Sequence, residues 1–187
     1  MRKLLQVVFL SFIIFILSAC ACKQVSWNIT RVSINPQVSY EIQGNELIIK
    51  DESLKLRLIL TPMTAGFFSN DIDHISCIIE NQGSKSIKVI FDESSIVSHE
   101  GKTYRAIRGK VRLINLGKPQ PPLVIPPQAA IDEDFFGAEE IEVIFTELGA
   151  VKIHPSLAKN EAGQSVRLLL VVKADRRYEI YVTLRAY

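Results

Sequence analysis

Apolar and polar residues alternate with a period of two along most of the chain, which is the pattern of β-strands that bury one face. Residues 54–61 place a leucine at every second position from Leu54 to Leu60. The same alternation runs through 166–173 and 178–184, which are separated by Ala174-Asp175-Arg176-Arg177. These last two runs predict a C-terminal β-hairpin. The positions expected to face the core are Leu54, Leu56, Leu58, Leu60, Val166, Leu168, Leu170, Val172, Tyr178, Ile180, Val182 and Leu184.

Shorter runs predict further strands, and turn residues such as Asn35-Pro36 and Gly44-Asn45 separate them. The expected strands are 28–34, 38–43, 45–50, 74–80, 87–91, 102–108, 111–116 and 141–146. Residues 137–146 are also compatible with a short helix. No long segment has a 3.6-residue period, so we expect an all-β fold, a single antiparallel sandwich over residues 27–187.

The first residues form an export signal. Arg2 and Lys3 precede a mostly apolar run, 4–17, and small residues follow it. About 14 apolar residues are too few for a comfortable membrane span of about 20. A plain signal peptide, or an N-terminal helical anchor that happens to contain a cysteine, would share this pattern.

The run Leu17-Ser18-Ala19-Cys20 resembles the lipobox of bacterial lipoproteins. The resemblance implies that residues 1–19 are removed and that Cys20 receives the lipid. It also implies a protein held in the cell membrane and facing the periplasm. Ala21 favours the outer membrane over the inner one in bacteria that have both. Residues 20–26 would form a tether that reaches roughly 20 Å, so the domain would lie close to the bilayer.

Charge narrows the class of protein further. The 187 residues hold 22 Lys+Arg and 20 Asp+Glu. Removing Arg2 and Lys3 with the leader leaves 20 of each, so the exported part is neutral. Its ordinary apolar content and neutral charge argue against disorder, a multi-span membrane protein and a globally basic nucleic-acid binder.

Two further cysteines, Cys22 and Cys77, follow the expected lipidation site. An exported compartment permits a disulfide between them. However, period two places Cys77 on one face with Ile75 and Ile79, which favours a buried free thiol.

A broader resemblance covers residues 75–187. The segments 81–89, 92–97 and 101–105, the Pro-rich element Gln120–Pro127 and the terminal hairpin are similar to small immunoglobulin-like domains of uncharacterised bacterial envelope lipoproteins. The resemblance implies an immunoglobulin-like β-sandwich and carries over no catalytic residue.

The sequence offers little catalytic chemistry. It contains no Gly-x-Ser-x-Gly elbow, no phosphate-binding glycine loop and no Cys-x-x-Cys, and His74, His99 and His154 stand apart from one another. Residues 132–143 match a calcium loop at the first, third and sixth positions but have Phe136 and Val143 at the fifth and twelfth. We therefore expect no enzyme and no cofactor, and a solvated acidic loop rather than a calcium site of Asp132, Asp134 and Glu139.

Two charged segments are candidate surfaces. Residues 102–118 are basic without an acid, and 132–147 are acidic without a base. Arg108, Lys110 and Arg112 alternate with uncharged residues and predict a basic stripe on one strand face. Three interpretations are open. The two segments are solvated or partly pair with each other, the stripe is a partner-docking face, or the stripe contacts anionic lipid headgroups.

Paired aromatics are the other candidates. Exposed Phe67 and Phe68, beside Gly66, would form a binding tip. In extended chain, however, neighbours point to opposite faces, so one Phe of this pair and one of Phe135-Phe136 can enter the core.

The function that these features favour is a lipid-anchored envelope module for interaction or structure, with an envelope protein as partner. The alternative is a binding protein for a small glycan or lipid. An apolar pocket bordered by Phe67, Phe68 or Phe135 would favour the alternative, and a flat face of mixed charge would favour protein docking.

Overall fold

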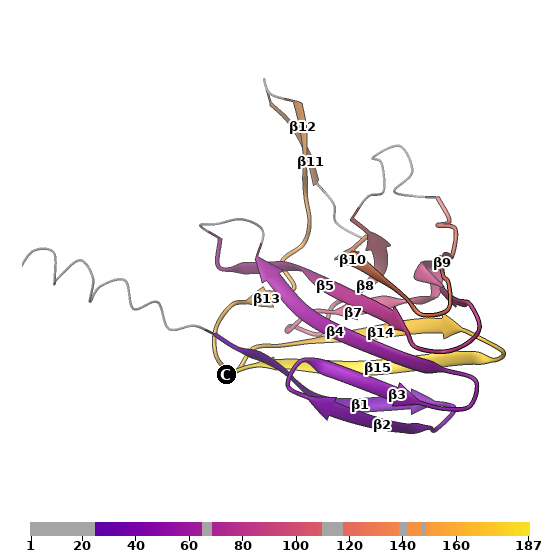
Figure 1. The fold of residues 1–187 in the computed structure, drawn as a ribbon. Helices are drawn as coiled ribbons and strands as arrows, with labels where there is room; N and C mark the ends of the chain where they lie inside the picture. The colour runs from indigo at the N-terminus through magenta and orange to yellow at the C-terminus, as the bar shows by residue number, and fades with distance from the viewer. Residues whose placement is uncertain (1–24, 65–68, 110–117, 139–141, 147–148) are drawn as a thin grey trace, which may run out of the picture.

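The computed structural model describes residues 25–64, 69–109, 118–138, 142–146 and 149–187 (Figure 1). Several sequence predictions lie outside these ranges: the strand at 111–116, the anchor at Cys20 and the residues Cys22, Phe67, Phe68, Lys110, Arg112 and Glu139. Among the described residues, no helix is long and apolar enough to cross a membrane.

The described chain consists of β-strands and one short 3-10 turn, η1. The elements are β1 (Trp27–Asn35), β2 (Ser39–Gln43), β3 (Glu46–Lys50), β4 (Lys55–Thr64), β5 (Asp71–Asn81), β6 (Ile87–Val89), η1 (Phe91–Glu93), β7 (Ser95–Val97), β8 (Thr103–Arg108), β9 (Leu123–Ile125), β10 (Ala129–Gly137), β11 (Glu142–Thr146), β12 (Gly149–Ile153), β13 (Ala158–Lys159), β14 (Ser165–Lys173) and β15 (Arg177–Ala186).

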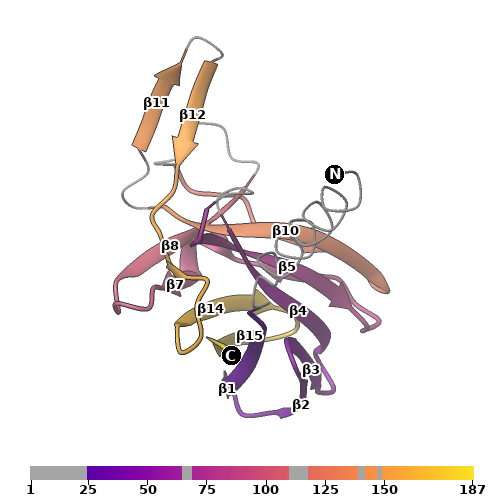
Figure 2. The same ribbon diagram turned by 90° about the vertical axis from the view of Figure 1, so that its left-hand side faces the viewer.

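Thirteen of these strands form one antiparallel sheet that curls almost into a barrel (Figure 2). Its order is β1-β15-β14-β7-β8-β10-β5-β4-β3-β2, with β6, β9 and β13 attached beside this path. The first and last strands, β1 and β2, come together at a seam without forming a ladder. The predicted all-β antiparallel class is therefore confirmed.

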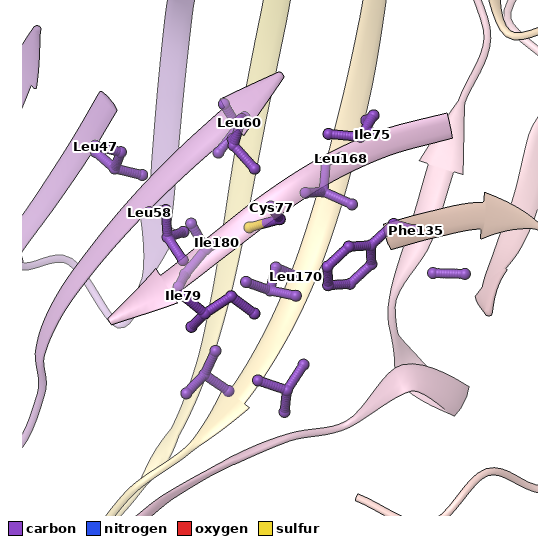
Figure 3. Close-up of a cluster of buried hydrophobic side chains, with 14 of the residues drawn as sticks. Leu47, Leu58, Leu60, Ile75, Cys77, Ile79, Phe135, Leu168, Leu170 and Ile180 are labelled. Atoms are coloured by element: carbon purple, nitrogen blue, oxygen red, sulfur yellow. The ribbon is translucent and has the colours of Figure 1, made fainter. Parts of the chain in front are cut away.

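The core fills the space between the two halves of the curled sheet. Strands β4 and β5 lie across it from β14 and β15, with the side chains of both halves interleaved (Figure 3). All the alternating positions predicted to face inward are at most 1% exposed. The predicted C-terminal hairpin is also present, paired from Ser165↔Arg185 to Lys173↔Arg177. Burial of these leucines, isoleucines and valines supplies the main drive for folding.

Cys77 lies within this core with Ile75 and Ile79, as the alternation predicted. Its thiol is free and buried. Burial, which disfavours the thiolate, raises the pKa of Cys77 well above the range of an ordinary cysteine.

One expectation for the acidic half was wrong and another was confirmed. Residues 132–134 are not a solvated loop but the middle of β10, which pairs with β5 from Ala129↔Asn81 to Phe136↔His74. Residues 142–146 form strand β11, which confirms the strand expected at 141–146 over the alternative of a short helix. In both places the backbone hydrogen bonds go to a neighbouring strand, and the polar composition does not reveal that partner.

Candidate docking surfaces

The hairpin β11–β12 stands away from the barrel (Figures 1 and 2). It forms its own two-stranded sheet, paired from Glu142↔Ile153 to Thr146↔Gly149. Within the described ranges, no strand of the large sheet pairs with either of its strands. A hairpin with two open edges is marginal alone and is a template for another strand.

The hairpin leaves the barrel at a tightly packed junction. The Phe136 ring, on the outer face of β10, lies between the His74 ring at 4.7 Å and the His154 ring at 4.1 Å between centroids. A methyl group on Gly137 would come within 2.9 Å of Cβ and Cγ of Tyr104. The Ala138 N–H donates to the Arg105 carbonyl at 2.8 Å. These contacts fix where the chain leaves the barrel and where it returns.

Two of the histidines that stand apart in sequence, His74 and His154, therefore meet around one phenylalanine. His74 Nδ1 is 2.6 Å from Asp73 Oδ1, and its Nε2 is 4.0 Å from Asp134 Oδ1. No group of three or more His, Cys, Asp or Glu among the described residues is placed to hold a metal ion. The junction is therefore a packed aromatic cluster with a charged rim.

Beneath this junction, the predicted basic stripe contributes one residue to an internal ion pair. Arg108 donates from Nε and from one terminal nitrogen to Glu133 Oε2, at 2.9 and 2.6 Å. The Glu133 side chain is 2% exposed and that of Arg108 is 26% exposed. The guanidinium also lies 5.7 Å from the centre of the Phe91 ring. The basic and acidic segments thus pair at this point, while the docking face of Arg108, Lys110 and Arg112 stays a prediction.

Gln120 fastens the chain where it returns to β8 after residues 110–117. Its side-chain amide accepts from Arg108 N–H at 3.0 Å and donates to the Ala106 carbonyl at 3.1 Å. Its own N–H donates to the Asp92 carboxylate, which also pairs with Arg105. The buried side-chain amide of Gln120 thus makes two hydrogen bonds to the backbone of β8 that a neighbouring strand would otherwise make.

The seam between β1 and β2 is a second open surface. Two hydrogen bonds cross it: Ile29 N–H to the Gly44 carbonyl at 2.7 Å, and the Tyr40 hydroxyl to the Val32 carbonyl at 3.2 Å. Beside the second bond, toward the turn that joins the two strands, lies a hollow of about 330 Å³. Its walls are Val32, Ser33, Ile34, Gln37, Val38 and Tyr40. Both strands therefore have backbone groups that face the seam without a ladder.

A third surface lies at the end of the barrel where β1 begins. Ser26 pairs with Tyr187 through both backbone bonds, and the Trp27 indole donates to Asn160 at 3.0 Å. A polar hollow of about 370 Å³ lies at this end. Its walls include Asp71, His99, Glu100, Lys102, Ser156, Lys159 and Gln164.

The groups in this hollow satisfy one another. Lys159 Nζ is 2.5 Å from Asp71 Oδ1, and the hydrogen bond from that ammonium lowers the pKa of Asp71. The Ser156 hydroxyl donates to the same carboxylate at 3.1 Å. His99 Nδ1 accepts the backbone N–H of Ser165 at 3.2 Å. The Ser156 hydroxyl and the Lys159 ammonium thus share the carboxylate of Asp71.

At the opposite end, a charged cluster closes the C-terminal hairpin. The Tyr178 hydroxyl donates to Asp51 at 2.5 Å, and Arg176 contacts both groups. The tyrosine bond lowers the pKa of Asp51, and burial raises the pKa of Tyr178. The β3–β4 turn and the β14–β15 turn are thereby tied together.

Phe135 and Phe136 divide as extended chain predicts. Phe135 is fully buried and stacks on Phe91 at 5.0 Å between centroids, whereas Phe136 points outward to the junction. Phe135 therefore borders no surface pocket. The binding tip of Phe67 and Phe68 remains untested.

Comparison with known proteins does not assign the chain to a family. No protein-family model matches the sequence, and no curated protein is significantly similar to it. A crystal structure of Northeast Structural Genomics Consortium target SoR45 aligns over 88% of this chain and 84% of its own, with 11% identity and a TM-score of 0.30. That score is too low to carry an argument about fold or function.

Proposed function

We propose that this chain is a lipid-anchored bacterial envelope protein, built on an immunoglobulin-like β-sandwich, that acts as a non-catalytic docking module. The observation that carries the proposal is the β11–β12 hairpin, which stands off the barrel and pairs with no other strand in the described part of the chain. Strand addition to such an edge is a common mode of protein recognition, because the backbone supplies the hydrogen bonds.

The anchor is the lipid on Cys20, which follows removal of residues 1–19. Residues 20–26 form the tether, and Ala21 favours the outer membrane. The pairing of Ser26 with Tyr187 supports a short tether, because it attaches the last residue of this segment to the barrel. The docking hairpin is therefore presented within the periplasm, close to a bilayer.

The alternative is a binding protein for a small glycan or lipid headgroup. The polar hollow beside Lys159 and His99 favours it, because it lies at the end of the barrel from which the tether leaves. Two of its charged groups, Lys159 and Asp71, are already paired, and a ligand that binds either group would have to replace that pair. The hairpin needs no such exchange, and docking is therefore the better supported function.

Two measurements test the proposal. Metabolic labelling with an alkyne palmitate analogue should mark the full-length chain and fail to mark Cys20→Ser; equal labelling of both would contradict the anchor. Crosslinking in the native membrane should then give an adduct that disappears when 142–153 is replaced by a Gly-Ser linker of equal length.

Arg167→Gln is the matched control, because Arg167 is an exposed residue of β14 away from the hairpin, and it should keep the adduct. Recovery of monomer alone from every version would contradict docking. Calorimetric binding of an envelope glycan or a headgroup, abolished by Lys159→Ala and retained without the hairpin, would favour the alternative.

A further inference from the structure

The free edge of β2 exposes a row of backbone groups at the seam. Strand β2 pairs with β3 alone among the described strands, from Ser39↔Lys50 to Gln43↔Glu46. All five of its residues are exposed, including Tyr40 at 42% and Ile42 at 38%. A long exposed edge with apolar residues and no proline is one to which another strand adds readily.

The turn geometry identifies which groups are open. Gly44 and Asn45 form a two-residue turn, so Gln43 and Glu46 exchange backbone bonds, and the ladder then alternates. Glu41 therefore bonds to β3, while the N–H and C=O of Tyr40 and Ile42 face the seam. No described strand pairs with this edge.

The hairpin has the matching properties. Its strands are five residues long, as β2 is, and half of their ten residues are strand-forming apolar types: Val143, Ile144, Phe145, Val151 and Ile153. Charge selects between its two edges. Glu41 is the charged residue of β2 and forms an exposed ion pair with Lys50 of β3 at 2.9 Å, Lys152 is the charged residue of β12, and β11 carries the acidic Glu142.

The hairpin and β2 lie on opposite sides of the barrel in both views (Figures 1 and 2). A hairpin therefore does not reach the β2 edge of its own chain. A contact between two different patches of identical chains is head-to-tail, and it can extend from copy to copy.

We propose that β12 of one copy adds as a strand to the free edge of β2 in a second copy of this chain. The inference rests on the proposed docking role of the hairpin and names its partner. Each junction extends the large sheet by two strands and covers open edges on both copies. Tethering all copies to one bilayer raises their local concentration and favours such an assembly.

The test uses two differently tagged full-length copies in the same cells. One copy carries a photoreactive residue at position 42, and illumination should give a mixed dimer in which that residue is joined to 149–153 of the other copy. A photoreactive residue at position 151 should give the reciprocal dimer.

With the photoreactive residue at 151, Ile42→Pro in the other copy should lower the dimer yield about fivefold, the effect of losing one net hydrogen bond. The proline removes an N–H that does not serve the β2–β3 ladder, and Ile42→Val is the matched control that keeps it. If the proline variant unfolds, charge exchange replaces it: Lys152→Glu in the copy with the photoreactive residue should weaken the dimer, and Glu41→Lys in the other copy should restore it.

Position 151 crosslinked solely to a different protein would overturn self-assembly and leave the docking function standing. Dimers joined at surfaces other than β2 would overturn it in the same way. No adduct from either position would overturn both proposals.

Discussion

The buried pair of Arg108 and Glu133 gives the sharpest prediction about stability. Replacing Arg108 by Met keeps much of its apolar stem but leaves the Glu133 carboxylate buried without a cation. Replacing Glu133 by Met instead leaves a guanidinium that already reaches solvent. The two substitutions should therefore differ in cost, although they break the same ion pair.

The expected losses of stability follow from how far the side chains of Arg108 and Glu133 are exposed. Removing one partner of a buried pair costs about 3–5 kcal/mol. We expect about 3 kcal/mol for Arg108→Met, the lower end, because a quarter of the arginine side chain is exposed. Glu133→Met should cost about 1 kcal/mol, since Arg108 can turn toward water. The double variant should lie within about 1 kcal/mol of the wild type, because it buries no unpaired charge.

The assay is urea unfolding of the Cys20→Ser chain without its leader, at pH 7, with the four versions forming a double-mutant cycle. Arg167→Met, on the exposed face of β14, is the control and should change the free energy of unfolding by less than about 0.5 kcal/mol. If Arg108→Met costs no more than this control, the assignment of Arg108 to an internal role is wrong.

Three further outcomes are expected. Asp51→Asn should destabilise the protein at pH 7, and this loss should shrink as the pH falls below 4. A carboxyl whose pKa is lowered by folding contributes fully while it is ionised in both the folded and the unfolded state, and the contribution is lost as the pH falls through the pKa of the folded state. A loss that stays constant from pH 6 to pH 2 would contradict the bond to Tyr178. In a chain without Cys20 and Cys22, Cys77 should react with a thiol reagent in urea but not in buffer, since burial raises the pKa of its thiol. Rapid labelling of the folded chain would refute the position of Cys77 in the core. Gly137→Ala should lower the free energy of unfolding, measured by thermal unfolding, by about 1–3 kcal/mol, because its methyl group would meet Tyr104. Gly101→Ala is the control: its methyl group meets no atom within 4 Å, so it should show only the strain of its positive φ. Equal effects would argue against a packed junction.

The strands could be predicted where the signal is local. Alternation at 54–60 and in the terminal hairpin reports burial directly, because period two separates the inner face from the outer. The order of strands has no such signal. That β10 lies between β5 and β8, or that β1 and β2 meet at a seam, depends on contacts between distant segments.

The same difference between local patterns and distant contacts explains which site residues could be predicted from the sequence. Counting back by two from Phe135 places Glu133 inside, and a buried acid requires a cationic partner, so the pair with Arg108 could have been anticipated. The acidic residues on either side of Glu133, Asp132 and Asp134, predicted a solvated loop instead. The bonds of Gln120 to β8 could not have been found, because a glutamine that replaces a strand has no sequence signature.

On the proposed lipid anchor, the two-way backbone bond between Ser26 and Tyr187 would allow the orientation of the barrel on the membrane to be changed by experiment. A short linker between these residues, with new ends opened at the Ala174–Arg176 turn, would give a circularly permuted chain with the same strands. A lipid attached to the new N-terminus would then hold the opposite end of the barrel at the membrane. Comparing the two orientations would reveal whether the surfaces act by their chemistry alone or by their height above the bilayer.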